Sequence, residues 1–194
     1  GTIRVEIGGR LPAHVYPKDV ILHLVGRIGA EGASYKVIEF HGDAVRAMST
    51  SGRLVLCNMS VEAGATSGIV PPDEETVRYL REEAGVDGPI EGVVPDPDAA
   101  YDAVVEIDAA SLGPQVACPH AVDSVKPIEE VIGRKVDQIV IGSCTNGRLD
   151  DLEVVARTLA GRRVAPGTRL LVFPASWRIY VEALRRGYLQ TLVE

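Results

Sequence analysis

The chain has 194 residues, of which 46% are hydrophobic and 24% are charged, and it carries a net charge of −7 at pH 7. This length allows a large domain, or a domain and a half, with its own hydrophobic core. The negative charge argues against nucleic acid or an anionic membrane surface as a partner. The sequence contains no run of about 18 apolar residues, so it predicts no transmembrane helix. Its three cysteines are widely spaced, which favours a reducing cytoplasm over a disulfide framework.

Strands and helices alternate along the first half of the chain. Residues 2–8 alternate apolar and polar side chains, which predicts a half-buried strand rather than a signal peptide. A helix is expected from Pro17, and residues 36–40 predict a second strand that leads into a short helix. Residues 53–65 are apolar on nearly all sides, so a helix at this place is expected to be buried.

The middle of the chain is richer in turn-forming residues. Pro71 and its neighbours predict the start of an amphipathic helix whose Val77 and Leu80 face inward. Residues 84–99 are rich in Gly, Pro and Asp and predict a surface connection, and a strand is expected at 101–107. Residues 111–126 are expected to be irregular and 127–132 to form a short helix.

The last part reads as strand, helix, strand and helix at 137–142, 149–159, 168–173 and 177–194. Such alternation predicts an α/β fold with parallel strands and right-handed crossovers. We expect a three-layer α/β/α domain with a mostly parallel sheet, followed by the first βαβα of a second, similar domain. The expected parts are residues 1–122, a linker at 123–135 and a truncated domain at 136–194. Two strands make a thin sheet for a finished domain, so a fragment of a longer protein is expected.

Cys144 is the first candidate functional residue. The strand at 137–142 ends in small polar residues, which places the thiol at the carboxyl end of a strand, where ligands bind in open α/β sheets. Asn146 is expected to cap a helix that begins near Arg148, and the N–H groups of that first turn would favour a thiolate. A thiolate can be a nucleophile or a metal ligand, and the alternative is a small buried cysteine.

Asn58 and Glu62 form a second candidate pair, because residues four apart lie on one face of a helix. A carboxylate in so apolar a segment is costly to bury unless a partner compensates its charge. The pair therefore belongs either to a salt bridge or cap towards a neighbouring domain, or to a polar face directed into a cleft.

Other candidates rest on less specific patterns. Cys118 and His120 could form a metal pair, although one Cys-x-His is a weak signal. His41 ends a strand and is expected to satisfy a turn, and Cys57 is expected in the core. The arginines of the second half are expected on solvated helix faces, with an anion-binding role left open: Arg148, Arg162, Arg163, Arg178, Arg185 and Arg186.

Two segments together resemble the aconitase superfamily. Gly142-Ser-Cys-Thr-Asn146, followed by Arg148 and Asp150-Asp-Leu152, is similar to one family signature, and Leu56-Cys-Asn-Met-Ser-Val-Glu-Ala-Gly-Ala65 to a second. The similarity is greatest to the branch that contains the large subunits of 3-isopropylmalate dehydratase and homoaconitase, and it runs over essentially the whole chain.

This resemblance implies a [4Fe-4S] hydro-lyase that isomerises a hydroxy di- or tricarboxylic acid by dehydration and rehydration. The first expected reaction converts 2-isopropylmalate to 3-isopropylmalate in leucine biosynthesis, with homoaconitase or aconitase chemistry as alternatives. Cys144 matches the first of three cysteine ligands of the cluster. Glu62 matches the carboxylate that reaches the hydroxyl on the open iron, and Asn58 matches an amide near the cluster, whereas Cys57 and Cys118 match no ligand.

The chain also departs from the family pattern. It has no Cys-x-x-Cys for the other two ligands. By the same resemblance, the family's N-terminal domain and its swivelling domain, which can be a separate small subunit, are expected to lie outside these residues. This fragment alone is therefore expected to bind no cluster and to be inactive. Two rival hypotheses are a hydrolase or transferase with Cys144 as nucleophile, and a scaffold domain without chemistry. A buried Glu62 would argue against the scaffold.

Overall fold

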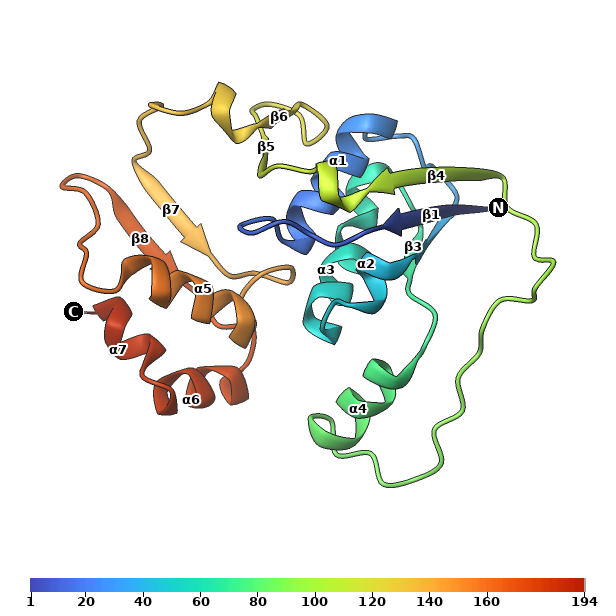
Figure 1. Cartoon of the computed structure of the whole chain (residues 1–194). Helices are drawn as coiled ribbons and strands as arrows, with labels where there is room; N and C mark the ends of the chain where they lie inside the picture. The colour runs from blue at the N-terminus through green and yellow to red at the C-terminus, as the bar shows by residue number, and fades with distance from the viewer. Residues whose placement is uncertain (194) are drawn as a thin grey trace. The chain divides into compact units, whose positions relative to one another are not determined.

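The computed structural model describes residues 1–193 and divides into two compact units, Gly1–Ile132 and Gly133–Glu194 (Figure 1). The division falls within residues 123–135, the range that the sequence predicts as a linker. The assignment of residues 1–122 and 136–194 to two domains of a larger fold stays a prediction. Each unit is described below by itself.

The first unit contains a four-stranded sheet in the order β3-β2-β1-β4, in which all three pairings are parallel. Its strands are β1 (Thr2–Gly8), β2 (Val37–His41), β3 (Ser67–Ile69) and β4 (Ala103–Asp108). The sequence pattern missed the three-residue β3 and located the other three. The predicted α/β fold with a mostly parallel sheet is confirmed.

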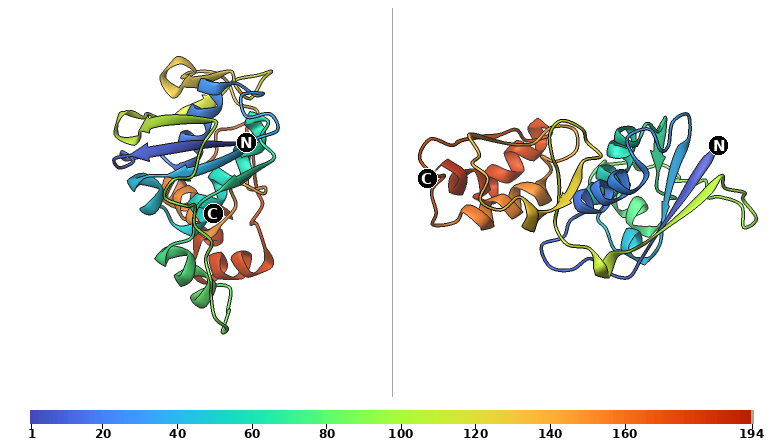
Figure 2. Two further views of the ribbon diagram at one scale, coloured as in Figure 1. Left: turned by 90° about the vertical axis from the view of Figure 1, so that its right-hand side faces the viewer. Right: turned by 90° about the horizontal axis from the view of Figure 1, so that it is seen from above.

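Two helices form a layer on one face of this sheet: α1 (Pro17–Ile28) and α3 (Thr50–Met59). Figure 2 shows both on the same side of the strands. Alternate residues of β1 point towards them, so Ile3, Val5 and Ile7 are each at most 4% exposed. Burying such side chains contributes about 1.5–3 kcal/mol each, and this layer is one of the two helical layers of the expected α/β/α arrangement.

The opposite face of the sheet carries polar side chains that pair with one another. His41 ends β2, and its Nε2 lies 2.5 Å from Glu39 Oε1, to which the Tyr101 hydroxyl donates at 2.9 Å. Arg4 Nη2 lies 2.8 Å from Glu6 Oε2 on β1. His41 thus has a structural partner on its own strand, whereas the expectation placed its contact in the following turn.

A short helix, α2 (Asp43–Arg46), follows β2, and α4 (Glu74–Glu82) follows β3. No residue of α4 is buried and Val77 is 41% exposed, so the expectation that Val77 faces inward is wrong. Instead, Asp73 caps α4 and pairs with the guanidinium of the buried Arg53 at 2.5 and 2.7 Å. Polar contacts at its first turn, rather than an apolar face, hold this helix to the unit.

The end of the first unit has more structure than the sequence predicts. A 3-10 turn, η2 (Ala109–Ser111), precedes an antiparallel pair of β5 (Gln115–Ala117) and β6 (Val125–Pro127). The helix expected at 127–132 is only the 3-10 turn η3 (Ile128–Glu130). The expectation that residues 111–126 are irregular was also wrong, because these strands have three residues each, too few for a recognisable alternation.

The second unit begins with two parallel strands, β7 (Gln138–Ile141) and β8 (Arg169–Val172), separated by α5 (Leu149–Leu159). The single helix expected at 177–194 is instead α6 (Trp177–Arg185) and α7 (Tyr188–Val193). Gly187, with φ of +76°, separates them because only glycine adopts this conformation without strain. The fully buried side chains of this small core include Leu152. Over residues 1–193, no helix has the length and hydropathy to cross a membrane.

The contact between Arg53 and Asp73 predicts a specific dependence of stability on pH. The hydrogen bond from Arg53 lowers the pKa of Asp73. This contribution to stability is therefore complete above the pKa of an unfolded aspartate, about 3.9, and is lost as the pH falls through the lower folded value. Asp73→Asn keeps a capping side chain but removes the charge, so we expect a loss of about 1–3 kcal/mol at pH 7.

Urea unfolding at several pH values measures this effect. The wild-type protein should lose stability more steeply than Asp73→Asn below about pH 4. Asp43→Asn is the matched control, because Asp43 pairs with Arg46 at an exposed position and should contribute less than about 1 kcal/mol. Equal acid slopes for the wild type and Asp73→Asn would contradict the prediction.

Candidate functional site

The residue Cys144 is exposed on the turn that follows β7. The structural alternative of a small buried cysteine is therefore wrong. Two glycines let this turn approach the end of β8, because a Cβ at Gly142 or Gly147 would lie 2.4 or 2.6 Å from the carbonyl oxygen of Phe173. The close contact with Phe173 thus explains why the two residues that flank this short segment around Cys144 are glycines.

The carboxylate of Asp151 holds the same turn from the first turn of α5. One of its oxygens accepts a hydrogen bond from Asn146 Nδ2 at 2.7 Å, and the other accepts the backbone N–H groups of Gly147 and Arg148 at 2.9 and 3.0 Å. The N-cap residue of α5 is Arg148, so the expectation that Asn146 caps this helix is wrong. Asn146 instead helps to hold the turn, because its side-chain amide donates a hydrogen bond to Asp151.

A cavity of about 340 Å³ opens beside the turn, at the carboxyl ends of β7 and β8. This is the edge at which ligands bind in open α/β sheets. The cavity is lined by Ser143, Cys144, Arg148, Phe173, Pro174 and Ala175. Its wall therefore combines a thiol, a hydroxyl and a guanidinium with an apolar side. Within residues 1–193, the buried Nε of Arg148 and Oδ1 of Asn146 have no hydrogen-bond partner.

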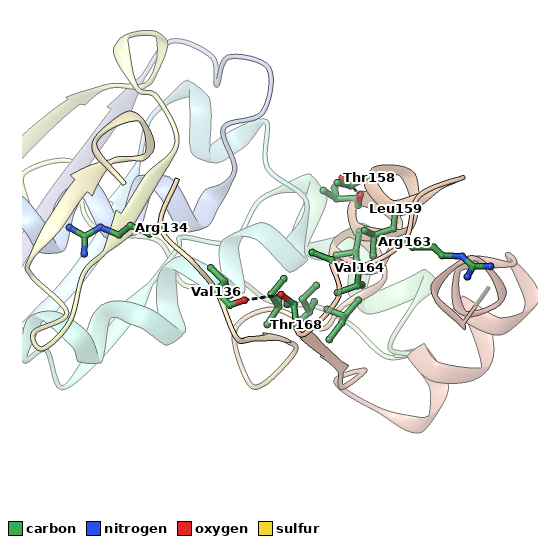
Figure 3. Close-up of a pocket in the computed structure, with 13 residues that line it drawn as sticks. Arg134, Val136, Thr158, Leu159, Arg163, Val164 and Thr168 are labelled. Atoms are coloured by element: carbon green, nitrogen blue, oxygen red, sulfur yellow. Dashed lines mark hydrogen bonds between the residues drawn. The ribbon is translucent and has the colours of Figure 1, made fainter. Parts of the chain in front are cut away.

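A larger cavity of the second unit, about 540 Å³, has a different character. It lies between α5 and the two strands and is lined mainly by aliphatic side chains such as Ile139, Val155 and Leu170. Figure 3 shows that the guanidinium groups of Arg134 and Arg163 point away from these side chains. A hydrophobic wall without converging charges does not provide groups for acid–base chemistry, so the smaller cavity is the candidate site.

Both members of the pair Asn58 and Glu62 are exposed, and they lie in the first unit. Asn58 is in the last turn of α3, which ends at Met59, and Glu62 is in the 3-10 helix η1 (Ser60–Ala63). The expectation that this segment is buried on all sides is wrong, since its buried side chains include Met59 and Ala63 but not Glu62. Burial of Glu62 therefore gives no argument against a scaffold.

The candidate residues are divided between the two units, with Cys144 in the second. All four histidines lie in the first unit, so the second unit itself offers no imidazole to activate Cys144 as a nucleophile. Across residues 1–193, no group of three or more His, Cys, Asp or Glu side chains is placed to hold a metal ion. This result gives no support to a metal site at Cys118 and His120.

The other cysteines differ from Cys144 in their surroundings. Cys57 lies partly buried in α3, and burial raises the pKa of its thiol. Cys118 follows β5, where its backbone N–H donates to the carbonyl of Ser124 at 2.8 Å. Cys144 is thus the exposed thiol among the three.

Two residues that the sequence analysis names have structural roles that it did not predict. Arg148 is partly buried and lines the cavity with Cys144, rather than lying on a solvated helix face, and Asp151 organises the turn. The spacing of an N-cap residue and an acidic residue three positions later is the signal that could have located Asp151. No local pattern distinguishes a cavity arginine from an arginine on a solvated helix face.

Comparisons with known proteins match the whole chain. The family model described as "Aconitase family (aconitate hydratase)" matches residues 1–135 and 126–194. The chain is 52% identical over 194 residues to "3-isopropylmalate dehydratase large subunit 1" of Methanopyrus kandleri, and covers 46% of that protein. It is 47% identical over 193 residues to "Probable methanogen homoaconitase large subunit" of Methanosarcina mazei, and covers 48%. All of this chain is aligned in both cases, so it spans about half the length of these relatives.

The hydrogen bonds of Asp151 predict that the turn around Cys144 depends on this carboxylate. Asp151→Ala removes one acceptor group from three donors and should cost about 1–2 kcal/mol. Amide hydrogen exchange should accelerate in residues 143–149. Asp150→Ala is the matched control, because Asp150 lies next to Asp151 in the first turn and accepts none of these three bonds. Equal protection of the turn in both variants would show that Asp151 does not hold it.

Proposed function

This chain belongs to the aconitase family, and on that premise we propose that it forms part of the large, catalytic subunit of a hydro-lyase. The reaction would isomerise a hydroxy acid by removing water and adding it back at the adjacent carbon. The alignment supports this proposal because it covers the whole chain at 52% identity to a protein named as a 3-isopropylmalate dehydratase large subunit. Because that relative is named as a large subunit, we also propose a small subunit as the partner of this chain.

The observation that carries the proposal is the exposed Cys144 in a cavity of mixed polar and apolar lining at the carboxyl edge of β7 and β8. A thiol held there by a rigid turn is suited to bind a metal centre that faces a ligand. One cysteine cannot hold a [4Fe-4S] cluster, since such clusters are bound by several thiolates. The described residues therefore do not form a complete cluster site, and we propose Cys144 as one ligand of a cluster completed by the longer protein.

For Glu62 we propose proton exchange with the hydroxyl group that leaves and returns. An exposed carboxylate at the end of α3 can approach a ligand without first losing a structural partner. Asn58, in the last turn of that helix, would donate or accept a hydrogen bond beside it. Both assignments rest on the family resemblance of the segment from Leu56 to Ala65.

We propose 2-isopropylmalate as the first substrate and 3-isopropylmalate as its product, as a step of leucine biosynthesis. Several relatives named for this activity align over the whole chain at 45–52% identity. Homoaconitase is the second candidate, because a relative with that name is 47% identical. Assays of the longer protein with its small subunit on both hydroxy acids would distinguish the two.

Replacing Glu62 tests its role. In the longer protein with its small subunit, Glu62→Gln should reduce turnover about a hundredfold or more, as expected for a lost proton-transfer group. Its free energy of unfolding should change by less than about 0.5 kcal/mol because the side chain is exposed. Glu91→Gln, at an exposed position of the surface connection, should leave both unchanged. If the Glu62 variant retains wild-type turnover, the assignment is wrong.

The single cysteine predicts how the cluster depends on the rest of the protein. The 194-residue chain, reconstituted anaerobically with iron and sulfide, should show no stoichiometric iron–sulfur absorbance in the visible range. The longer protein should show it, and Cys144→Ser should weaken or abolish it there. The matched Cys118→Ser should not change it. Close to one cluster per 194-residue chain would contradict the prediction.

A further inference from the structure

The side chain of Arg148 is unusual for an arginine that is partly buried. Arg148 lines the 340 Å³ cavity together with Cys144, and the Nε of its guanidinium is buried. Within residues 1–193 this Nε has no hydrogen-bond partner, and the side chain joins no ion pair. A buried donor without an acceptor is destabilising, and more so when it is charged. Such a group is retained more readily where a ligand supplies the missing acceptor.

Within residues 1–193, the carboxylate of Asp151 forms no hydrogen bond with this guanidinium. Both oxygens of Asp151 are occupied by Asn146 and by the backbone N–H groups of Gly147 and Arg148. This arrangement satisfies the backbone N–H of Arg148 and does not use its guanidinium. The second unit as a whole is positive, because residues 133–194 contain ten Lys and Arg against six Asp and Glu, although the whole chain has a net charge of −7.

From these observations we propose that Arg148 binds a carboxylate of the hydroxy acid beside Cys144. A guanidinium presents its N–H donors in a planar fork that matches a carboxylate. A cavity of about 340 Å³ is suited to a small ligand. The wall of Phe173, Pro174 and Ala175 leaves Arg148 as the cationic group that lines the cavity. The identity of the acid rests on the proposed function, whereas the anion site rests on the cavity and Arg148.

Alkylation of Cys144 tests the anion site in the 194-residue chain without any cluster. Iodoacetate is anionic and iodoacetamide is neutral, so the ratio of their rates at one pH reports the local charge independently of the fraction of thiolate. Arg148→Gln should lower this ratio at Cys144 about three- to tenfold, as expected for loss of one nearby charge. Peptide mass spectrometry resolves Cys144 from Cys118, whose ratio should not change.

Two controls accompany this measurement. Arg157→Gln removes a cation from the same helix, but Arg157 is exposed and pairs with Glu153, so the ratio at Cys144 should not change. Malonate should slow the reaction of Cys144 with iodoacetamide in the wild type and not in Arg148→Gln, whereas the neutral malonamide should not slow it in either. An unchanged ratio in Arg148→Gln, or equal protection by malonate in both proteins, would overturn the anion site.

Kinetics of the longer protein with its small subunit test the substrate. Arg148→Gln should raise KM about tenfold or more, since hydrogen bonds to charged groups contribute about 1.5–3 kcal/mol. Arg148→Lys should recover part of the loss, and iron content should stay at the wild-type level. Unchanged KM in an active enzyme would overturn the carboxylate role. A wild-type enzyme without isomerase activity would instead overturn the proposed function, while the alkylation result would still decide the anion site.

Discussion

The carboxylate of Asp151 is the constraint on which the candidate site depends. It accepts hydrogen bonds from the side-chain amide of Asn146 and from the backbone N–H groups of Gly147 and Arg148. These bonds fix both the turn after β7 and the start of α5. A loop of small residues would otherwise have many conformations, and ordering each residue costs about 1–2 kcal/mol of backbone entropy. One acidic side chain therefore lets the short second unit present Cys144 and Arg148 to the same cavity.

The two units place different demands on their candidate residues. In the first unit, the central strand β1 and the helices around it bury Ile7 and Leu24 completely, which gives Asn58 and Glu62 a rigid base at the end of α3. Over residues 133–193 the second unit has two strands and few fully buried residues, and its residue Val140 is 56% exposed. Its site is ordered by local hydrogen bonds to a greater extent than by a large core.

The regular elements could be predicted because their side chains repeat with a clear period. The pattern of α5 gave its bounds, and the alternation of Ile3, Val5 and Ile7 identified the central strand. The prediction that one face of α4 is buried was wrong. An amphipathic pattern identifies an apolar face, but it does not tell whether another part of the protein packs against that face. Exposure of Glu62 was also missed, since the change from an α-helix to a 3-10 helix after Met59 alters which side chains face the core. The cavity at Arg148 needs contacts between β7, β8 and α5, which no local pattern encodes.

The glycines beside Cys144 have a consequence for how sequence similarity is interpreted. Gly142 and Gly147 are required by the nearness of the carbonyl of Phe173, whatever the thiol between them does. A relative with a different function, or with none, would still need both glycines to fold this turn. Their presence therefore reports common ancestry and a shared backbone more securely than it reports a particular activity.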